Sequence, residues 1–288
     1  MVTTTGIPFT PPAGEVFAQW FDLEPLEDIP GTSQPPLTAY RNFLLDAQAT
    51  LTERFDQGND TLELMRARSW VVDQVLVRCW RHHLLDDIDA TLVAVGGYGR
   101  NELMPGSDID IMLLLADPEN RQTGEQLEAF LTLLWDIGLE VGHSVRTLDD
   151  CVEHGKADVT IATNLMEARA LYGSESLFND MRQRIGPDNI WPSADFFRAK
   201  LDEQKQRYSR YDDAVYNLEP NVKEGPGGLR DGQMIGWVFK RHFGSDRLYK
   251  LIEQGLITRE EYDTLMDSQR FLWRVRFGLH RVTGRRED

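Results

Sequence analysis

Two aspartates in the segment 93–115 have a spacing that suits metal chemistry. In the string VAVGGYGRNELMPGSDIDIMLLL, Asp108 and Asp110 are separated by one residue at the start of an apolar run. Alternate side chains of a β-strand lie on the same face, so both carboxylates would project together while Ile109 enters the core. Two adjacent carboxylates repel each other, and a divalent cation bound to both would relieve the repulsion. Their hard oxygen atoms favour magnesium or manganese.

Ten residues before this pair, two glycines could hold an anion. Gly96 and Gly97 end another apolar run, and they have no side chains to obstruct the approach of a ligand. We expect a short helix over residues 98–103, whose free amides would face a phosphate group. Ser107 can add a hydroxyl donor. Together these residues predict a site for a metal-bound triphosphate.

Other phosphate and metal motifs do not fit this stretch. No glycine loop ends in Lys-Ser or Lys-Thr, GGYGRNE lacks the spacing of a dinucleotide fingerprint, and DIDIMLLL lacks the glycine and distal glutamate of a calcium loop. The alternative interpretation is that the glycine pair and the aspartates are ordinary features of strand ends. The combination of both features with Ser107 favours the triphosphate site.

The elements expected around these residues form an α/β core. Apolar runs at 91–97 and 108–116 predict buried strands, and 139–148 predicts a third. Between them, helical periodicity over 123–138 is flanked by a capping box of Thr123 with Gln126 and by a terminating glycine. We also expect the helices listed next: bracing helices within 37–85, and later helices at 196–213, 234–242 and 260–282.

Composition excludes several classes of function. The 288 residues carry a formal net charge of -16, which disfavours nucleic acids and anionic membranes as partners. Acidic residues are in excess in the first 60 residues, whereas the part after Lys200 is nearly balanced and rich in arginine. No apolar run is long enough to cross a bilayer, and Cys79 and Cys151 fit no zinc or disulfide pattern. We therefore expect a cytoplasmic location.

The glycines and aspartates also carry a family resemblance. The pattern VGG, ten residues, DIDI resembles the signature of the DNA polymerase beta-like nucleotidyltransferases, whose fold has a small mixed sheet. Over residues 40–288 the chain is similar to the bifunctional uridylyltransferase and uridylyl-removing enzymes (GlnD) of bacterial nitrogen regulation. The strings that carry this similarity are GGYGRNELMPGSDIDIMLLL, LLWDIGLEVGHSVRTLDDC, ATNLMEARALYG, YNLEPNVKEGPGGLRD and LWRVRFGLH.

The resemblance implies a reaction and assigns roles in it. Gly96, Gly97 and Ser107 would hold the phosphates of UTP, and Asp108 and Asp110 would bind catalytic magnesium. The reaction would transfer UMP to a tyrosine of the signalling protein PII and release pyrophosphate. Two metal ions can stabilise both the attacking and the leaving oxygen of such an in-line displacement.

The superfamily usually adds a third carboxylate from a following strand. Glu140 is the candidate metal and catalytic ligand, because it would share a strand face with Gly142 and Ser144. A related adenylyltransferase pattern instead has its acid where Ser144 falls here. The alternative interpretation of Glu140 is a charge at the strand edge.

Three basic residues are further candidates for nucleotide binding. Arg100 follows the glycine turn and could contact phosphate, although a structural salt bridge fits equally well. Lys223 and Arg230 flank the EGPGG turn, which the resemblance places in a helical region beside the transferase fold. They could contact the outer phosphates, or the turn could simply join two helices.

The resemblance also predicts the domain organisation. We expect a proline-rich arm over residues 1–38, a nucleotidyltransferase domain with bracing helices over 39–190, and a helical domain over 191–288. Family members also carry an HD hydrolase domain that removes UMP and two glutamine-sensing ACT domains. This chain contains no His-Asp dipeptide, so we interpret it as a fragment without the removing activity. There are two alternative functions. One is adenylyl transfer by an enzyme of the same superfamily, and the other is a non-catalytic module that binds nucleotide or protein.

Overall fold

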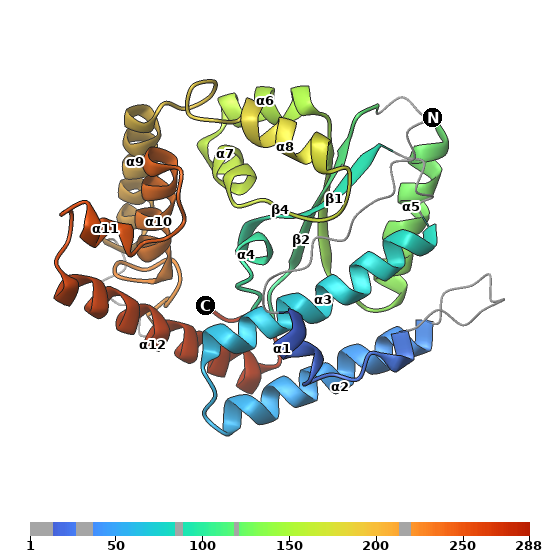
Figure 1. The fold of residues 1–288 in the computed structure, drawn as a ribbon. Coiled ribbons are helices and arrows are strands. Elements are labelled where there is room, and N and C mark those ends of the chain that lie inside the picture. The colour runs from blue at the N-terminus through green and yellow to red at the C-terminus, as the bar shows by residue number, and fades with distance from the viewer. Residues whose placement is uncertain (1–13, 27–36, 84–88, 118–120, 213–219) are drawn as a thin grey trace.

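The computed structural model describes residues 14–26, 37–83, 89–117, 121–212 and 220–288 (Figure 1). A four-stranded mixed sheet lies at its centre, in the order β3-β2-β1-β4. The strands are β1 Ala90–Ala94, β2 Ile109–Leu115, β3 Val141–Arg146 and β4 Arg169–Gly173. The neighbours β2 and β3 are parallel, whereas β1 is antiparallel to both β2 and β4. The small mixed sheet and the three expected strands are confirmed, and β4 is an additional strand.

Both faces of the sheet are covered by helices, which explains why its central strands are continuous apolar runs. On one face, Leu92 and Leu113 pack into the main core with α3 and α5. On the other face, Val93, Met112 and Leu114 pack into a second core. The helices of the first face are α3 Thr61–His83 and α5 Arg121–Asp136, and those of the second are α6 Leu148–Ala157, α7 Val159–Met166 and α8 Glu175–Arg184. Figure 1 shows the sheet between these two layers.

The bracing helices form as expected, although one cap differs. Helix α2 Leu37–Asp56 packs on α3. Helix α5 begins at Arg121, so Thr123 lies inside the helix and the predicted capping box at Thr123 is wrong. Gly138 ends this helix as expected: its φ is +90°, and its amide donates to the Trp135 carbonyl oxygen at 2.9 Å.

Residues 14–26 are packed more tightly than the predicted arm. They contain α1 Gly14–Ala18 and a 3-10 turn at Glu24–Leu26. Phe21 stacks on Trp70 of α3 with ring centroids 5.9 Å apart, and only 7% of Phe21 is exposed. The apolar residues between the prolines therefore join the main core. The rest of the predicted arm, 1–13 and 27–36, lies outside the described residues.

The last third of the chain is helical. The helices expected at 196–213, 234–242 and 260–282 are present as α9 Ser193–Asp212, α10 Leu229–Phe243 and α12 Arg259–Thr283, with a short α11 at Lys250–Glu253. Helix α12 returns beneath the sheet (Figure 1), where Trp273 and Phe277 enter the main core and the helix contacts α3. The helical part and the sheet part therefore share one core. Among the described residues, no helix has the length and apolar character needed to span a membrane.

Candidate active site

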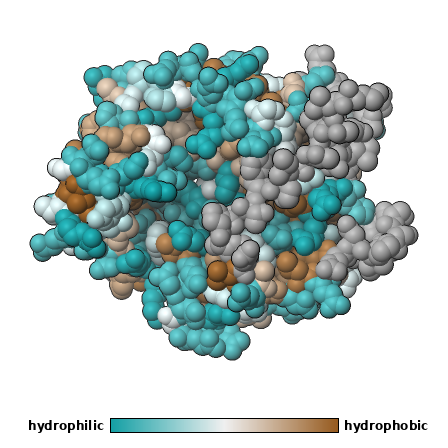
Figure 2. All heavy atoms as spheres, in the orientation of Figure 1, coloured by the Kyte–Doolittle hydropathy of each residue, from teal (hydrophilic) through white to brown (hydrophobic). Residues whose placement is uncertain are grey.

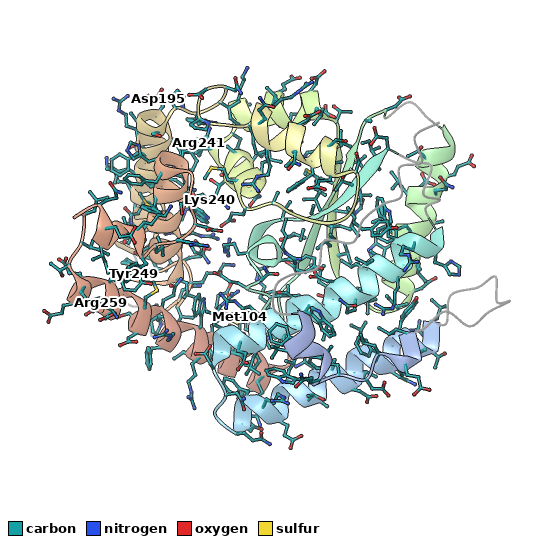
Figure 3. All side chains as sticks on the ribbon, in the orientation of Figure 1. Met104, Asp195, Lys240, Arg241, Tyr249 and Arg259 are labelled. Carbon is teal, nitrogen blue, oxygen red and sulfur yellow. The ribbon has the colours of Figure 1, made fainter. Side chains whose placement is uncertain are left out.

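A cavity of about 320 Å³ lies between the sheet and the helical part of the chain. All the residues proposed from the sequence line it except Glu140. The sheet side contributes Gly96, Gly97, Arg100, Ser107, Asp108 and Asp110, and the helical side contributes Lys223, Arg230, Gln233, Trp237, Trp273, Arg276 and Arg286. Met104, which also lines the cavity, lies between the two parts (Figure 3). The face of the molecule seen in Figure 2 is mostly hydrophilic.

The glycine turn is tighter than expected. Helix α4 covers only Gly96–Gly99, so the helix expected over 98–103 is wrong in both its start and its end. The chain leaves the helix because Asn101 adopts a left-handed conformation with a φ of +59°, which asparagine tolerates better than most residues. Gly96 itself has a φ of +59°. This turn exposes the main chain beside the strand that carries the aspartates.

The structure brings the glycine turn and the aspartates together. A Cβ atom built on Gly96 would lie 3.4 Å from Oδ2 of Asp110. The Val95 amide donates to the Asp110 carbonyl oxygen at 3.0 Å, which ties the end of β1 to β2. Partial burial raises the pKa of Asp110, and the neighbouring Asp108 carboxylate raises it further. Arg286 and Lys223 lower this pKa in part, because their positive charges face the same carboxylate.

The two aspartates fit a divalent cation. Their charges repel each other, as the raised pKa of Asp110 indicates, and their oxygen atoms are hard ligands. A positive group already contacts the pair: Nη1 of Arg286 lies 2.9 Å from Oδ2 of Asp108. In the part of the chain that the structure describes, no group of three or more Asp, Glu, His or Cys residues is placed to hold a metal. The described donor set is therefore the carboxylate pair.

Glu140 lies next to the pair in register but outside the cavity. The parallel pairing of β2 with β3 aligns Asp110 with Gly142, and the Ile109 amide donates to the Glu140 carbonyl oxygen at 3.0 Å. The Glu140 side chain is exposed, and it does not line the cavity. Its role as the third ligand stays a prediction. At Gly142, a Cβ atom would lie only 2.6 Å from Oδ1 of Asp110, so the missing side chain makes room for that carboxylate.

Arg100 braces the turn through ion pairs. Its Nε lies 2.9 Å from Glu102 and its Nη1 lies 2.7 Å from Glu167. Burial would lower the pKa of Arg100, but the two carboxylates outweigh burial and raise it. Glu167 is buried and also accepts a hydrogen bond from Nε1 of Trp237 on α10. Of the two interpretations of Arg100, this geometry favours the structural salt bridge.

A buried network beneath α4 was not anticipated from the sequence. Tyr98 donates its hydroxyl hydrogen to Oδ1 of Asp73 at 2.5 Å, and Arg169 of β4 binds the same carboxylate through both of its terminal nitrogens. Burial, followed by the charge of Asp73, raises the pKa of Tyr98 well above its usual value. The network joins α3, α4 and β4. The sequence feature that could have indicated this network is Asp73, a charged residue among the apolar residues of the expected helix.

The basic residues of the helical side differ in how they are held. Arg230 donates to Glu224 through Nη2 at 2.8 Å and to Gln233 through Nη1 at 3.0 Å. Lys223 lies 3.4 Å from Asp288, and burial lowers its pKa. Arg276, which the sequence interpretation did not single out, also lines the cavity. Its position on an amphipathic helix is typical of a solvated arginine, so no local sequence pattern indicates that it lines the cavity.

The fold and the site define a nucleotidyltransferase. The family model of the nucleotidyltransferase domain matches residues 76–169, which contain the glycine turn and both aspartates. The model described as GlnD PII-uridylyltransferase matches residues 195–288. Residues 76–169 thus match the nucleotidyltransferase domain family, and most of the chain is similar to proteins named bifunctional uridylyltransferase/uridylyl-removing enzyme.

Curated relatives cover most of this chain. A bifunctional uridylyltransferase/uridylyl-removing enzyme of Azotobacter vinelandii is 49% identical over 254 residues, which are 88% of this chain and 28% of the relative. A protein of the same name from Photobacterium profundum is 50% identical over 83% of this chain and 28% of its own length. The one from Stutzerimonas stutzeri is 45% identical over 95% and 31%, respectively. The chain thus spans less than a third of the length of these relatives.

Proposed function

We propose that this chain catalyses magnesium-dependent transfer of UMP from UTP to a tyrosine hydroxyl of the PII protein. The observation that carries the proposal is the pair Asp108 and Asp110 beside Gly96, in a cavity lined by basic side chains. The names of the relatives support UTP as the nucleotide. The family model described as a PII-uridylyltransferase supports PII as the acceptor.

The chain's own residues would position the triphosphate. Gly96 and Gly97 leave the main chain open to the phosphates, and Ser107 lines the cavity before the first aspartate. Lys223 supplies positive charge from the helical side. When bound by the aspartates, magnesium would stabilise the negative charge that develops on the phosphate oxygens.

The reaction itself is a displacement at the α-phosphorus. The tyrosine oxygen forms a bond to this phosphorus, and the bond to the bridging oxygen of pyrophosphate breaks. The hydroxyl proton, which an unperturbed tyrosine holds with a pKa of about 10, would pass to a carboxylate of the cavity or to solvent. The cavity would favour the displacement by binding the phosphates between the open main chain and the basic side chains. This binding would hold the α-phosphorus in line with the acceptor oxygen.

The test is transfer of labelled nucleotide to PII. We expect UMP transfer from UTP with magnesium, and loss of more than about 100-fold in Asp108→Asn, since even outer-shell partners of metal ligands contribute 10–100-fold. Asp136→Asn, at the exposed end of α5, is the matched control and should keep normal activity. AMP transfer from ATP, or nucleotide binding without transfer, would contradict the proposal in favour of the two alternative functions. Normal turnover in Asp108→Asn would remove the metal role of that residue.

A further inference from the structure

Residues 284–288, which follow α12, fold back against the cavity, and Arg286 lines it. Their main chain packs against Gly106, two residues before Asp108: a Cβ atom built on Gly106 would lie 2.7 Å from the carbonyl carbon of Arg285. Figure 1 marks this end of the chain between α4 and α12. The segment therefore reaches both the sheet side and the helical side of the proposed nucleotide site.

The segment places a positive group against the aspartate pair. Nη1 of Arg286 lies 2.9 Å from Oδ2 of Asp108, and both side chains are about half exposed, at 49% and 48%. A cationic side chain thus lies where the carboxylates would hold a metal ion.

Two residues further on, the segment places a negative group against the basic residues. The Asp288 carboxylate accepts a hydrogen bond from Nε of Arg276 at 2.5 Å and lies 3.4 Å from Nζ of Lys223. Burial opposes ionisation of this carboxyl group, but His280, Arg276 and Lys223 outweigh burial and hold its pKa well below the usual range. Lys223 and Arg276 therefore bind an anion in this structure, and that anion is a carboxylate of the chain itself.

His280 adds a donor that Asp288 does not fully use. The Gly106 amide donates to Nδ1 of His280 at 3.0 Å, which assigns the proton of a neutral ring to Nε2. This Nε2 is buried and has no hydrogen-bond partner among the described residues. It lies 3.8 Å from Oδ1 of Asp288, beyond hydrogen-bond distance. A phosphate group has more oxygen atoms than a carboxylate, so it could satisfy Arg276, Lys223 and His280 together.

We propose that Lys223, Arg276 and His280 form the subsite for the outer phosphates of the nucleotide. Arg286, in the cavity, and Asp288, beside it, then occupy the cation and phosphate positions from within the chain. The inference rests on the proposed function and adds the phosphate-binding residues to it. Because both positions are filled by charges of the correct sign, residues 285–288 compete with the metal-bound nucleotide. Nucleotide binding therefore requires Arg286 to move away from Asp108, and Asp288 to move away from Lys223 and Arg276.

The test measures binding rather than transfer. Manganese is titrated by its electron paramagnetic resonance signal, and inorganic tripolyphosphate and UTP with manganese are titrated by calorimetry. Arg286→Ala should bind manganese-UTP about two- to fivefold more tightly, the range for one half-exposed ion pair. Asp288→Asn should tighten binding by at least as much, because this side chain is only 16% exposed and contacts both Lys223 and Arg276. The matched controls are their neighbours Arg285→Ala and Glu287→Gln, which remove the same charges from side chains that pair with each other. These controls should bind like the unmodified chain.

The subsite itself is tested with Arg276. Arg276→Lys should weaken tripolyphosphate binding less than Arg276→Ala, for which we expect about tenfold or more, typical of a lost hydrogen bond to a charged group. Thermal unfolding shows whether each variant is folded. If Arg276→Ala does not fold, the affinities of Arg276→Lys and Asp288→Asn decide whether the subsite exists. Unchanged affinities in Arg286→Ala, Asp288→Asn and Arg276→Lys would overturn the inference. If Asp108→Asn still abolished manganese binding in that case, the proposed function would stand. If the unmodified chain and all variants bound neither manganese nor UTP, both proposals would fail.

Discussion

Gly142 sets the space available to the Asp110 carboxylate. A Cβ atom at this position would lie 2.6 Å from Oδ1 of Asp110, and the atom that must move is the end of a flexible side chain. We expect Gly142→Ala to keep the fold but to turn the Asp110 carboxylate away from its neighbour. Manganese affinity should then fall by about tenfold or more, the effect typical of disturbing a group that orients a metal ligand. Electron paramagnetic resonance titration measures this change.

Ser144→Ala is the control for this prediction. Ser144 is the next residue of β3 on the same strand face, and it pairs with Met112 rather than with an aspartate. Its removal should leave manganese affinity unchanged. Equal affinities of Gly142→Ala and the unmodified chain would show that Asp110 does not depend on this space.

At the scale of residues, the sequence predicted what is local. Asp108 and Asp110 are two positions apart on one strand, so their common face follows from the alternation of side chains alone. Arg276 and Arg286 could not be found in this way, because their place in the cavity depends on the return of α12 beneath the sheet. An arginine on an amphipathic helix has the same local pattern whether it faces solvent or a ligand.

Among the elements, α6 has a capping box whose contribution depends on pH. Thr147 and Asp150 exchange hydrogen bonds between side chains and amides at the start of this helix. The hydrogen bonds from Thr147 lower the pKa of Asp150. A carboxyl group with a lowered folded-state pKa stabilises the fold above its unfolded pKa of about 3.9, and the contribution is lost as the pH falls through the folded-state pKa. Asp150→Ala should cost about 1 kcal/mol at pH 7.

Urea unfolding at several pH values measures this contribution. The difference between Asp150→Ala and the unmodified chain should shrink below about pH 4, as the carboxyl group becomes protonated. The control is Asp149→Ala, since the Asp149 side chain is 91% exposed and its ion pair with Arg184 should contribute little. A pH-independent cost in Asp150→Ala would contradict the assignment to an ionised cap.

Helices with sustained periodicity were predictable, whereas two short elements were not. In α9, α10 and α12 many apolar residues recur at helical spacing on one face. A single residue that breaks the pattern therefore does not change the prediction of a helix. Helix α4 has only four residues, and its start is decided by the positive φ of Gly96. Strand β4 is five residues long and forms through pairing with β1, about 80 positions earlier, which no local pattern can reveal.

At the scale of the whole molecule, Arg241 joins the helical part to the sheet part. Its guanidinium is buried and donates to the carbonyl oxygens of Ile185 and Trp191 at 2.9 Å, and also to that of Ile190 (Figure 3). Arg241→Met would leave these carbonyl groups without their donor, which should cost about 3 kcal/mol. It should also weaken UTP binding, because Lys223 is positioned by the same helical part.

Urea unfolding and calorimetric UTP titration check the role of Arg241. Arg247→Met is the matched control, because Arg247 lies on the same part of the chain and is exposed. It should change neither stability nor affinity. A loss of stability in Arg241→Met with unchanged UTP affinity would show that this joint stabilises the fold without positioning the cavity.

The two cysteines report whether the two cores unfold together. Cys79 lies in the main core and Cys151 lies in the core on the other face of the sheet, and both are fully buried. Burial raises the pKa of Cys79 to about 12 and that of Cys151 to about 11, so almost no thiolate is present at pH 8. We expect neither thiol to react with a disulfide reagent at this pH until the protein unfolds.

Because β1 supplies Leu92 to one core and Val93 to the other, both thiols should become reactive at the same urea concentration. Reaction of Cys151 alone at lower urea, detected with Cys79→Ala and Cys151→Ala variants, would show instead that the second core opens while the main core stays folded.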